Sequence, residues 1–323
     1  MNKKNIFMGL ALALAVTACG NDAKDDTKTE TKTETSQVEE SKNQAESSVI
    51  YASFYPIYNL TRQIAGDKFD VKAFNSLTTE SHDFEPSAKE IAELSKSQLI
   101  FMNGAGMEDW KNDVEETVDI TMVDTSEGLD LIKADHDHEE GEEEGYHHHG
   151  EFDPHTWISP VNAKAQAKII ADKLIEIDPA NKDYYEKNYQ KVASEFDEII
   201  NEYKEKFNQV TNNKFIVPHE AFGYVARDFG LEQIPLASLT STADPDAKVM
   251  KEVTDLAKAD KIRTVFYEKG GSDKAAKTIA DEIGADTAPL STMEFASQDE
   301  IDKEVTIQEI IKENLENIYK SLA

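Results

Sequence analysis

Residues 181–209 read NKDYYEKNYQKVASEFDEIINEYKEKFNQ, and this stretch determines how the rest of the chain is organised. Its apolar residues recur at intervals of three and four: Tyr185, Tyr189, Val192, Phe196, Ile199, Tyr203 and Phe207. That spacing places them on one face of a single α-helix. At 1.5 Å per residue the helix would be roughly 43 Å long, enough to cross a domain. We therefore predict a rigid helix that connects the two flanking parts of the chain.

Short apolar runs alternate with helical patterns on both sides of this helix. Before it we expect strands at 49–54, 71–75, 99–103 and 120–124, and helices at 56–65, 87–97, 108–117 and from 160. After it we expect strands at 215–217, 233–237, 264–267 and 287–290, and helices at 221–229, 246–259, 273–283 and 305–322. This alternation is typical of parallel sheets covered by helices. The predicted fold is α/β, with two βα-type lobes of mostly parallel sheet: residues 49–178, a connecting helix at 179–210, and residues 211–323.

The first residues have the pattern of an export signal. Two lysines precede an apolar run, Ile6–Val16, which is too short to span a bilayer and has the length of a signal-peptide core. The run ends in VTAC at 16–19, which resembles the lipobox of bacterial lipoproteins, and Cys19 is the single cysteine. We predict a signal peptide at 1–18 and a lipidated Cys19 on a flexible tether at 19–48. This predicts an extracytoplasmic protein, lipid-anchored to the outer face of the cell membrane; an ordinary signal peptide is the alternative.

The chain is strongly acidic, with a formal net charge of −30 at pH 7. Nucleic acid is excluded as a partner because its phosphates would be repelled. Nine acidic residues lie at 135–153, without Lys or Arg, together with five histidines: His136, His138, His147, His148 and His149. Charges at this density prevent a packed core, so we predict a mobile loop. Imidazole and carboxylate both bind zinc, so we interpret the stretch as a low-affinity metal loop; a solvated acidic insert or an affinity tag are the alternatives.

The other three histidines are single and widely spaced. His82 lies between a predicted strand and a predicted helix, His155 precedes the helix that starts at 160, and His219 follows a predicted strand. In parallel α/β sheets, ligand sites form where strands give way to helices. Each histidine alone also fits a surface or capping role, but three at similar positions favour a shared site.

A zinc site takes about four nitrogen, sulfur or oxygen ligands. Three imidazoles would therefore need a fourth group. Glu294 follows the last predicted strand and could supply it, while Glu268 ends a strand in the same way. Spacing alone does not decide which of the two carboxylates is the fourth ligand.

Three motifs together resemble a known family. They are H-x-[FY]-E-P-[ST] at His82, D-P-H-x-W at His155 and H-E-A-F-G-Y at His219, with the acidic loop just before the second. In this order they resemble the metal-binding lipoproteins of bacterial ABC importers, the cluster A-I (cluster 9) solute-binding proteins, and most closely their zinc-specific ZnuA- and AdcA-like group. The resemblance covers about residues 48–323.

The resemblance implies two lobes joined by one long rigid helix, with the metal in the cleft between them. It implies ligands His82 and His155 from the first lobe, His219 from the second, and Glu294 or a water as the fourth. Relatives that carry manganese have a Glu at the third position and an Asp at the fourth. The three imidazoles here favour zinc, a borderline-soft tetrahedral ion.

The implied function is high-affinity capture of Zn²⁺ outside the membrane and its delivery to an ABC permease with its ATPase. We expect one tight zinc site, weak sites in the loop, a monomer and no enzymatic activity. No G-x-x-x-x-G-K-[ST] phosphate loop occurs in the sequence, so the ATPase is expected on another chain. The alternatives are a manganese-binding relative, a surface adhesin or metal buffer, and a secreted zinc hydrolase, which the missing H-E-x-x-H motif disfavours.

Overall fold

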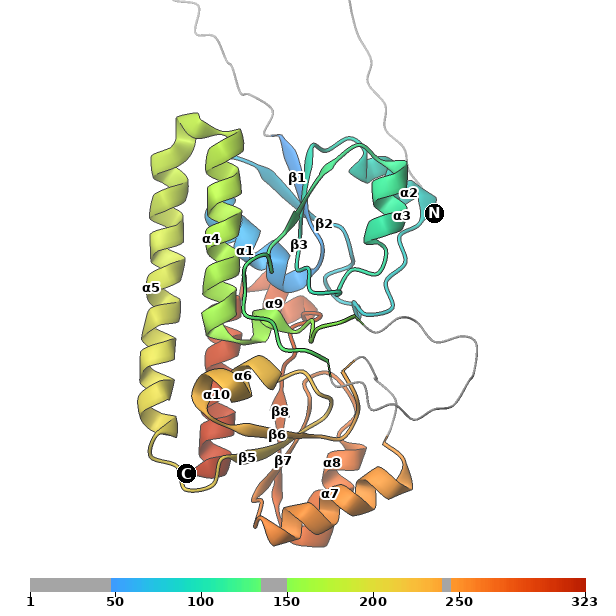
Figure 1. Cartoon of the computed structure of the whole chain (residues 1–323), viewed down its shortest axis with the longest axis vertical. Coiled ribbons are helices and arrows are strands. Elements are labelled where there is room, and N and C mark those ends of the chain that lie inside the picture. Colours follow the sequence, from blue (N-terminus) through green and yellow to red (C-terminus); the bar gives the residue numbers. More distant parts are fainter. Residues whose placement is uncertain (1–47, 135–149, 240–244) are drawn as a thin grey trace, which may run out of the picture. The chain divides into compact units, whose positions relative to one another are not determined.

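The computed structural model describes residues 48–134, 150–239 and 245–323, and these contain two four-stranded sheets (Figure 1). The strand orders are β2-β1-β3-β4 and β6-β5-β7-β8, and all neighbouring strands are parallel. The strands are β1 Val49–Ala52, β2 Asp70–Ala73, β3 Leu99–Met102, β4 Thr121–Asp124, β5 Lys214–Val217, β6 Glu232–Pro235, β7 Thr264–Glu268 and β8 Asp286–Leu290. The two sheets repeat one topology, and the predicted α/β fold with two parallel-sheet lobes is confirmed.

Helices connect the strands and cover the sheets. They are α1 Tyr55–Ala65, α2 Ala88–Leu94, α3 Lys111–Thr117, α4 Pro160–Ile177, α5 Lys182–Phe207, α6 Gly223–Phe229, α7 Ala247–Ala259, α8 Lys274–Ile283, α9 Gln298–Asp302 and α10 Ile307–Leu322. Two short 3₁₀ helices are η1 Thr156–Ile158 and η2 Pro179–Asn181. In the described parts of the chain, no helix combines the length and apolar character needed to cross a membrane.

Several predicted boundaries move by a few residues for identifiable reasons. The helix predicted at 108–117 begins at Lys111, because the Glu108 carboxylate instead accepts hydrogen bonds from the backbone N–H groups of Asn103 and Gly104. These contacts close the turn after β3. Helix α9 lies outside every predicted helix; its N-cap, Ser297, forms a capping box that starts a separate short helix.

Alternate side chains of the central strands enter different hydrophobic cores. On β3, Leu99 and Phe101 face the core that contains α1, α4 and α5, whereas Ile100 and Met102 face the core that contains α2 and α3. Strand β5 divides its side chains in the same way between the first core and a core formed with α7 and α8. Burial on both faces is typical of strands in parallel sheets. Each sheet therefore lies between two layers of helix.

The long helix predicted from the sequence is α5. Six of the seven residues in its apolar stripe are buried, and Tyr189 is partly buried. It packs against α1 and α4 beside the first sheet and against α6 and α10 beside the second, as Figure 1 shows. One continuous core follows it from β1 and α1 to β5 and α10. The two sheets are therefore joined by shared burial of apolar surface as well as by the chain itself.

Candidate metal centre

Four side chains from distant parts of the chain converge on one point. Each of His82, His155, His219 and Glu294 offers one ligand atom, and these atoms lie within 4.8 Å of one another. The Nε2 atoms of His82 and His155 are 3.2 Å apart. The Glu294 carboxylate lies 3.5 Å from each of these two Nε2 atoms and 3.4 Å from Nε2 of His219.

The four separations, 3.2–3.5 Å, are close to the edge of a zinc tetrahedron, although the Glu294 distances involve both of its carboxylate oxygens. With zinc–ligand bonds of about 2.0–2.2 Å, neighbouring ligand atoms lie about 3.3–3.6 Å apart. Nε2 of His219 and Oε1 of Glu294 are also buried without a hydrogen-bond partner. Buried polar atoms are nearly always satisfied, so such atoms require an explanation. A single divalent cation at the centre of the cluster supplies it.

The backbone around His82 is fixed by its neighbours. The Glu80 carboxylate accepts hydrogen bonds from the backbone N–H groups of Ser81 and His82, at 2.8 and 3.3 Å. The Ser81 hydroxyl accepts from the Asn75 amide at 3.1 Å and donates to the Glu294 carbonyl at 2.9 Å. The segment that carries His82 is therefore tied directly to the segment that carries Glu294.

His155 is held by a carboxylate on its far side. Oδ1 of Asp153 accepts from the ring Nδ1 at 2.8 Å and from the backbone N–H of His155 at 2.9 Å. With Nδ1 donating, Nε2 faces the cluster as a neutral ligand atom. Gly223 approaches Asp153 so closely that a Cβ there would lie 2.7 Å from its Oδ2, so a side chain at that position would displace the carboxylate that holds His155.

Asp153 corrects one sequence prediction. The acidic loop was expected to extend through Asp153, but this residue is 3% exposed and belongs to the metal centre. An isolated antiparallel bridge pairs Lys133 with Phe152, the residue just before Asp153.

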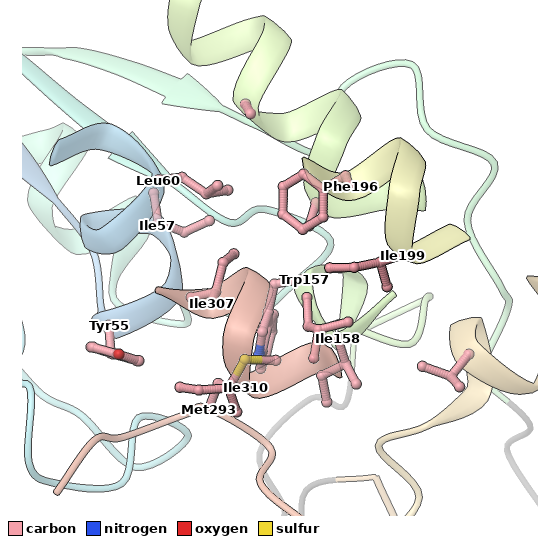
Figure 2. Close-up of a cluster of buried hydrophobic side chains, with 14 of the residues drawn as sticks. Tyr55, Ile57, Leu60, Trp157, Ile158, Phe196, Ile199, Met293, Ile307 and Ile310 are labelled. Atoms are coloured by element: carbon pink, nitrogen blue, oxygen red, sulfur yellow. The ribbon is translucent and has the colours of Figure 1, made fainter. Parts of the chain in front are cut away.

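Glu294 reaches the cluster because of the unusual backbone before it. Met293 has a positive φ of 62°, rare for a residue with a side chain, and it buries its own side chain in the main core. Figure 2 shows Met293 in that core together with Trp157 and Ile310. The indole of Trp157 donates to the Thr292 carbonyl at 2.6 Å. Core packing therefore holds two of the segments that form the centre: Met293 packs beside Glu294, and Trp157 packs two residues after His155.

The electrostatics of the cluster are strongly coupled. Burial alone would raise the pKa of Glu294, but the close approach of the imidazoles of His155, His219 and His82 lowers it well below its usual value. Burial opposes a charge on His219, yet the carboxylates of Glu268 and Glu294 raise its pKa to about 10. The pKa of His155 is also raised, because Asp153 and Glu294 outweigh its burial. The imidazoles and the Glu294 carboxylate therefore favour one another's charged forms, so protons and a cation would compete for the same ring nitrogens.

Glu80 also adjoins the cluster; the sequence makes it a candidate only as the base of the alternative zinc hydrolase. Burial and the neighbouring Glu294 raise the pKa of Glu80 to about 8. It is therefore mostly neutral at pH 7. Asp153 is part of the D-P-H motif, whereas Glu80 precedes the motif at His82 and lies outside it.

The structure brings together all four residues predicted to bind the metal. Glu268, the rival to Glu294, lies behind His219 instead, with its Oε2 3.5 Å from the ring Nδ1. The predicted lipidation site Cys19 and the loop histidines His136, His138, His147, His148 and His149 lie outside the described residues.

Two parallel sheets and a buried set of three imidazoles and one carboxylate define a metal-binding α/β protein. A family model described as ZnuA, zinc-uptake complex component A, periplasmic, matches residues 50–321, and the chain belongs to this family. It is 33% identical to the high-affinity zinc uptake system protein ZnuA of Bacillus subtilis, over 98% of this chain and 97% of that protein. The predicted membership of the ZnuA- and AdcA-like group is confirmed.

Solved structures show the same architecture. The Zn(II)-bound ZnuA-like domain of Streptococcus pneumoniae AdcA matches with a TM-score of 0.72 and 27% identity, over 85% of this chain and 98% of that one. The laminin-binding protein Lmb of Streptococcus agalactiae, described as a bifunctional protein with adhesin and metal transporting activity, matches with a TM-score of 0.72 and 28% identity. That match covers 85% of this chain and all of the other.

Proposed function

We propose that this protein captures Zn²⁺ outside the cytoplasm and delivers it to an ABC permease, with His82, His155, His219 and Glu294 as the four ligands. The observation that carries the proposal is the convergence of three imidazoles and one carboxylate, whose ligand atoms lie within 4.8 Å of one another in a buried centre. Membership of the zinc-uptake family supports the same function.

The donor set supports zinc over manganese. Three imidazole nitrogens and one carboxylate oxygen suit a borderline-soft ion, whereas manganese prefers oxygen-rich sites of higher coordination number. The third ligand is His219, where manganese-carrying relatives have a Glu. The preference for zinc therefore rests on ligand type as well as on geometry.

The four-ligand arrangement also supports transport over hydrolysis. A catalytic zinc keeps one coordination position open for water or substrate. Here Glu294 takes the fourth position and is only 1% exposed. Adhesion is described for the relative Lmb and would be a second activity of the surface, separate from the metal centre.

The remaining parts of the proposal concern anchoring and partners. Cleavage before Cys19 and lipidation of its thiol would place the protein at the outer face of the membrane. The permease and its ATPase would be separate chains, and the protein would act as a monomer. We propose lobes at 49–178 and 211–323 with the connecting helix at 179–210, supported by the two separate sheets and α5.

The test offers the full chain equal excesses of Zn²⁺ and Mn²⁺ at pH 7.5, washes it with a weak chelator and counts retained metal by elemental analysis. The wild type should keep one zinc, and the His155→Ala variant none. Replacing His147, His148 and His149 by alanine should leave the count at one. Retention of manganese by the wild type, or of zinc by His155→Ala, would contradict the proposal.

A cellular test addresses transport. Cells that lack the protein should fail to grow in zinc-chelated medium, and the wild-type gene should restore growth. The His155→Ala gene should not restore it, although equal amounts of protein are made. Normal growth of the deleted strain would point to a buffering or adhesive role instead.

A further inference from the structure

The outer ring nitrogen of His219 faces a carboxylate that belongs to neither the ligand set nor any recognised motif. Nε2 of His219 faces Glu294 at 3.4 Å, and Nδ1 faces Oε2 of Glu268 at 3.5 Å. Glu268 is the last residue of β7, and its backbone pairs with Leu290 of β8. Its position is therefore fixed by the sheet.

The Glu268 carboxylate is oriented by Thr292. The Thr292 hydroxyl donates to Oε1 of Glu268 at 2.7 Å, and the Thr292 backbone N–H donates to the same oxygen at 3.3 Å. The other oxygen, Oε2, is buried without a hydrogen-bond partner. One oxygen is thus engaged, and the other remains available to accept a hydrogen bond from Nδ1 of His219.

Glu268 is badly placed to be a ligand itself. The metal would lie on the Nε2 side of the His219 ring, whereas Oε2 of Glu268 lies on the Nδ1 side. Glu268 also stands outside the set of atoms that converge within 4.8 Å. Any action of Glu268 on the metal must therefore pass through the imidazole of His219.

His219 needs such support because it borders open space. A cavity of about 310 Å³ is lined by His219, Glu268, Glu80 and Phe295, among others. An imidazole beside a cavity has room to rotate away from the centre. His155, by contrast, is fully buried and held by Asp153 at 2.8 Å.

We propose that Glu268 is the positioning residue for His219, as Asp153 is for His155. It accepts the Nδ1 proton and so presents Nε2 to the zinc. A movement of roughly 0.6 Å would shorten the 3.5 Å separation to a normal hydrogen bond. Such outer carboxylates orient metal-bound imidazoles, and their loss typically weakens metal binding about 10–100-fold. The proposal rests on the proposed function, since it requires zinc on His219.

The test measures zinc affinity and the rates of zinc association and dissociation with a competing chromophoric chelator at pH 7.5. Glu268→Ala should weaken binding about 10–100-fold through faster dissociation, with an unchanged association rate. Glu268→Gln, whose amide oxygen can still accept the Nδ1 proton, should stay within about fivefold of the wild type. The zinc affinity of Thr292→Val should lie between those of Glu268→Ala and Glu268→Gln. This variant provides a second measurement if Glu268→Ala fails to fold. Glu313→Gln, an exposed carboxylate on α10, is the matched control and should bind like the wild type.

Several results would overturn the proposal. If Glu268→Ala binds zinc with an affinity within threefold of the wild type, Glu268 does not position His219. If Glu268→Ala and Glu268→Gln lose the same amount of affinity, the hydrogen bond to Nδ1 is not what supports binding. A loss that arises only from slower association would make Glu268 a transient ligand. A changed coordination number in the visible spectrum of the Co²⁺-loaded Glu268→Ala variant would make it a direct ligand. If His219→Ala bound zinc as tightly as the wild type, the proposed function would fail first.

Discussion

Replacing Glu294 by glutamine tests the centre most directly. The change keeps the size of the side chain and the core packing of Met293, but it removes the negative charge that faces three imidazoles. Structural zinc sites with four ligands contribute about 10–16 kcal/mol at pH 7. Equal division assigns about 2.5–4 kcal/mol to each ligand, which corresponds to an affinity loss of about 10²–10³-fold.

A second effect of the same substitution acts in the opposite direction. Glu294 helps to raise the pKa of His219 to about 10, so protons compete with zinc for this imidazole at neutral pH. Without the carboxylate that pKa falls and the competition weakens, which offsets part of the lost ligand. The offset shrinks as the pH approaches 10. We therefore expect a larger loss at pH 9 than at pH 7.

The assay is chelator competition at both pH values, with Glu313→Gln as a control that removes an equal charge outside the centre. Circular dichroism checks that each variant is folded. An affinity of Glu294→Gln within threefold of the wild type at pH 9 would refute the reasoning. It would mean that water replaces the carboxylate at no cost, or that Glu294 is not a ligand.

Three other outcomes follow from the structure. The pKa values of His219 and His155 are raised in the folded protein, so both histidines stabilise the metal-free protein fully below about pH 6.5, and this stabilisation is lost as the pH rises towards 10. Thermal unfolding of the metal-free protein at pH 7 and pH 10 should show this loss. Zinc affinity should rise over the same pH range. Phe196→Ala, in the fully buried stripe of α5, should lower the free energy of unfolding by about 3–5 kcal/mol in urea titrations, whereas the exposed Lys191→Ala should change it by less than about 0.5 kcal/mol. Deleting residues 135–149 should leave the tight-site affinity within threefold in the competition assay, because the bridge between residues 133 and 152 lies outside the deletion.

Much of the fold could be predicted from local sequence. Strands buried on both faces appear as short apolar runs, and the stripe of α5 has a clear helical period. The parallel order of the sheets followed from the alternation of strands and helices. Helix ends were less predictable where a side chain forms a contact with distant backbone, as Glu108 does with the turn after β3.

The proposed fourth ligand shows where sequence reasoning reaches its limit. Glu268 and Glu294 both follow strands, and spacing could not separate them. The structure separates them through the positive φ of Met293, which turns Glu294 inward, and through Thr292, which holds Glu268 behind His219. Both effects depend on tertiary contacts that no local pattern encodes.

Asp153 shows a related limit. The density of acidic residues predicts a loop that includes Asp153. Composition describes a whole segment, so it cannot single out one residue with a different role. Its actual role depends on one carboxylate oxygen and two hydrogen bonds to His155. The D-P-H motif contained this information, since an acidic residue two positions before a ligand can reach its outer ring nitrogen.

The contacts around the centre also indicate which movement would open it at least cost. The segment that carries Glu294 belongs to the second half of the chain, yet its backbone is bonded to Ser81, to the indole of Trp157 and, through Ala296, to Leu77 of the first half. Separating the halves would break these hydrogen bonds, each worth about 0.5–1.5 kcal/mol, and would expose part of the core along α5. Rotating the His219 ring towards the neighbouring cavity would break its contacts with Glu268, Glu294 and the proposed metal, but it would leave the hydrogen bonds between the halves intact. The pair of His219 and Glu268 is therefore a part of the centre that can move without separating the halves.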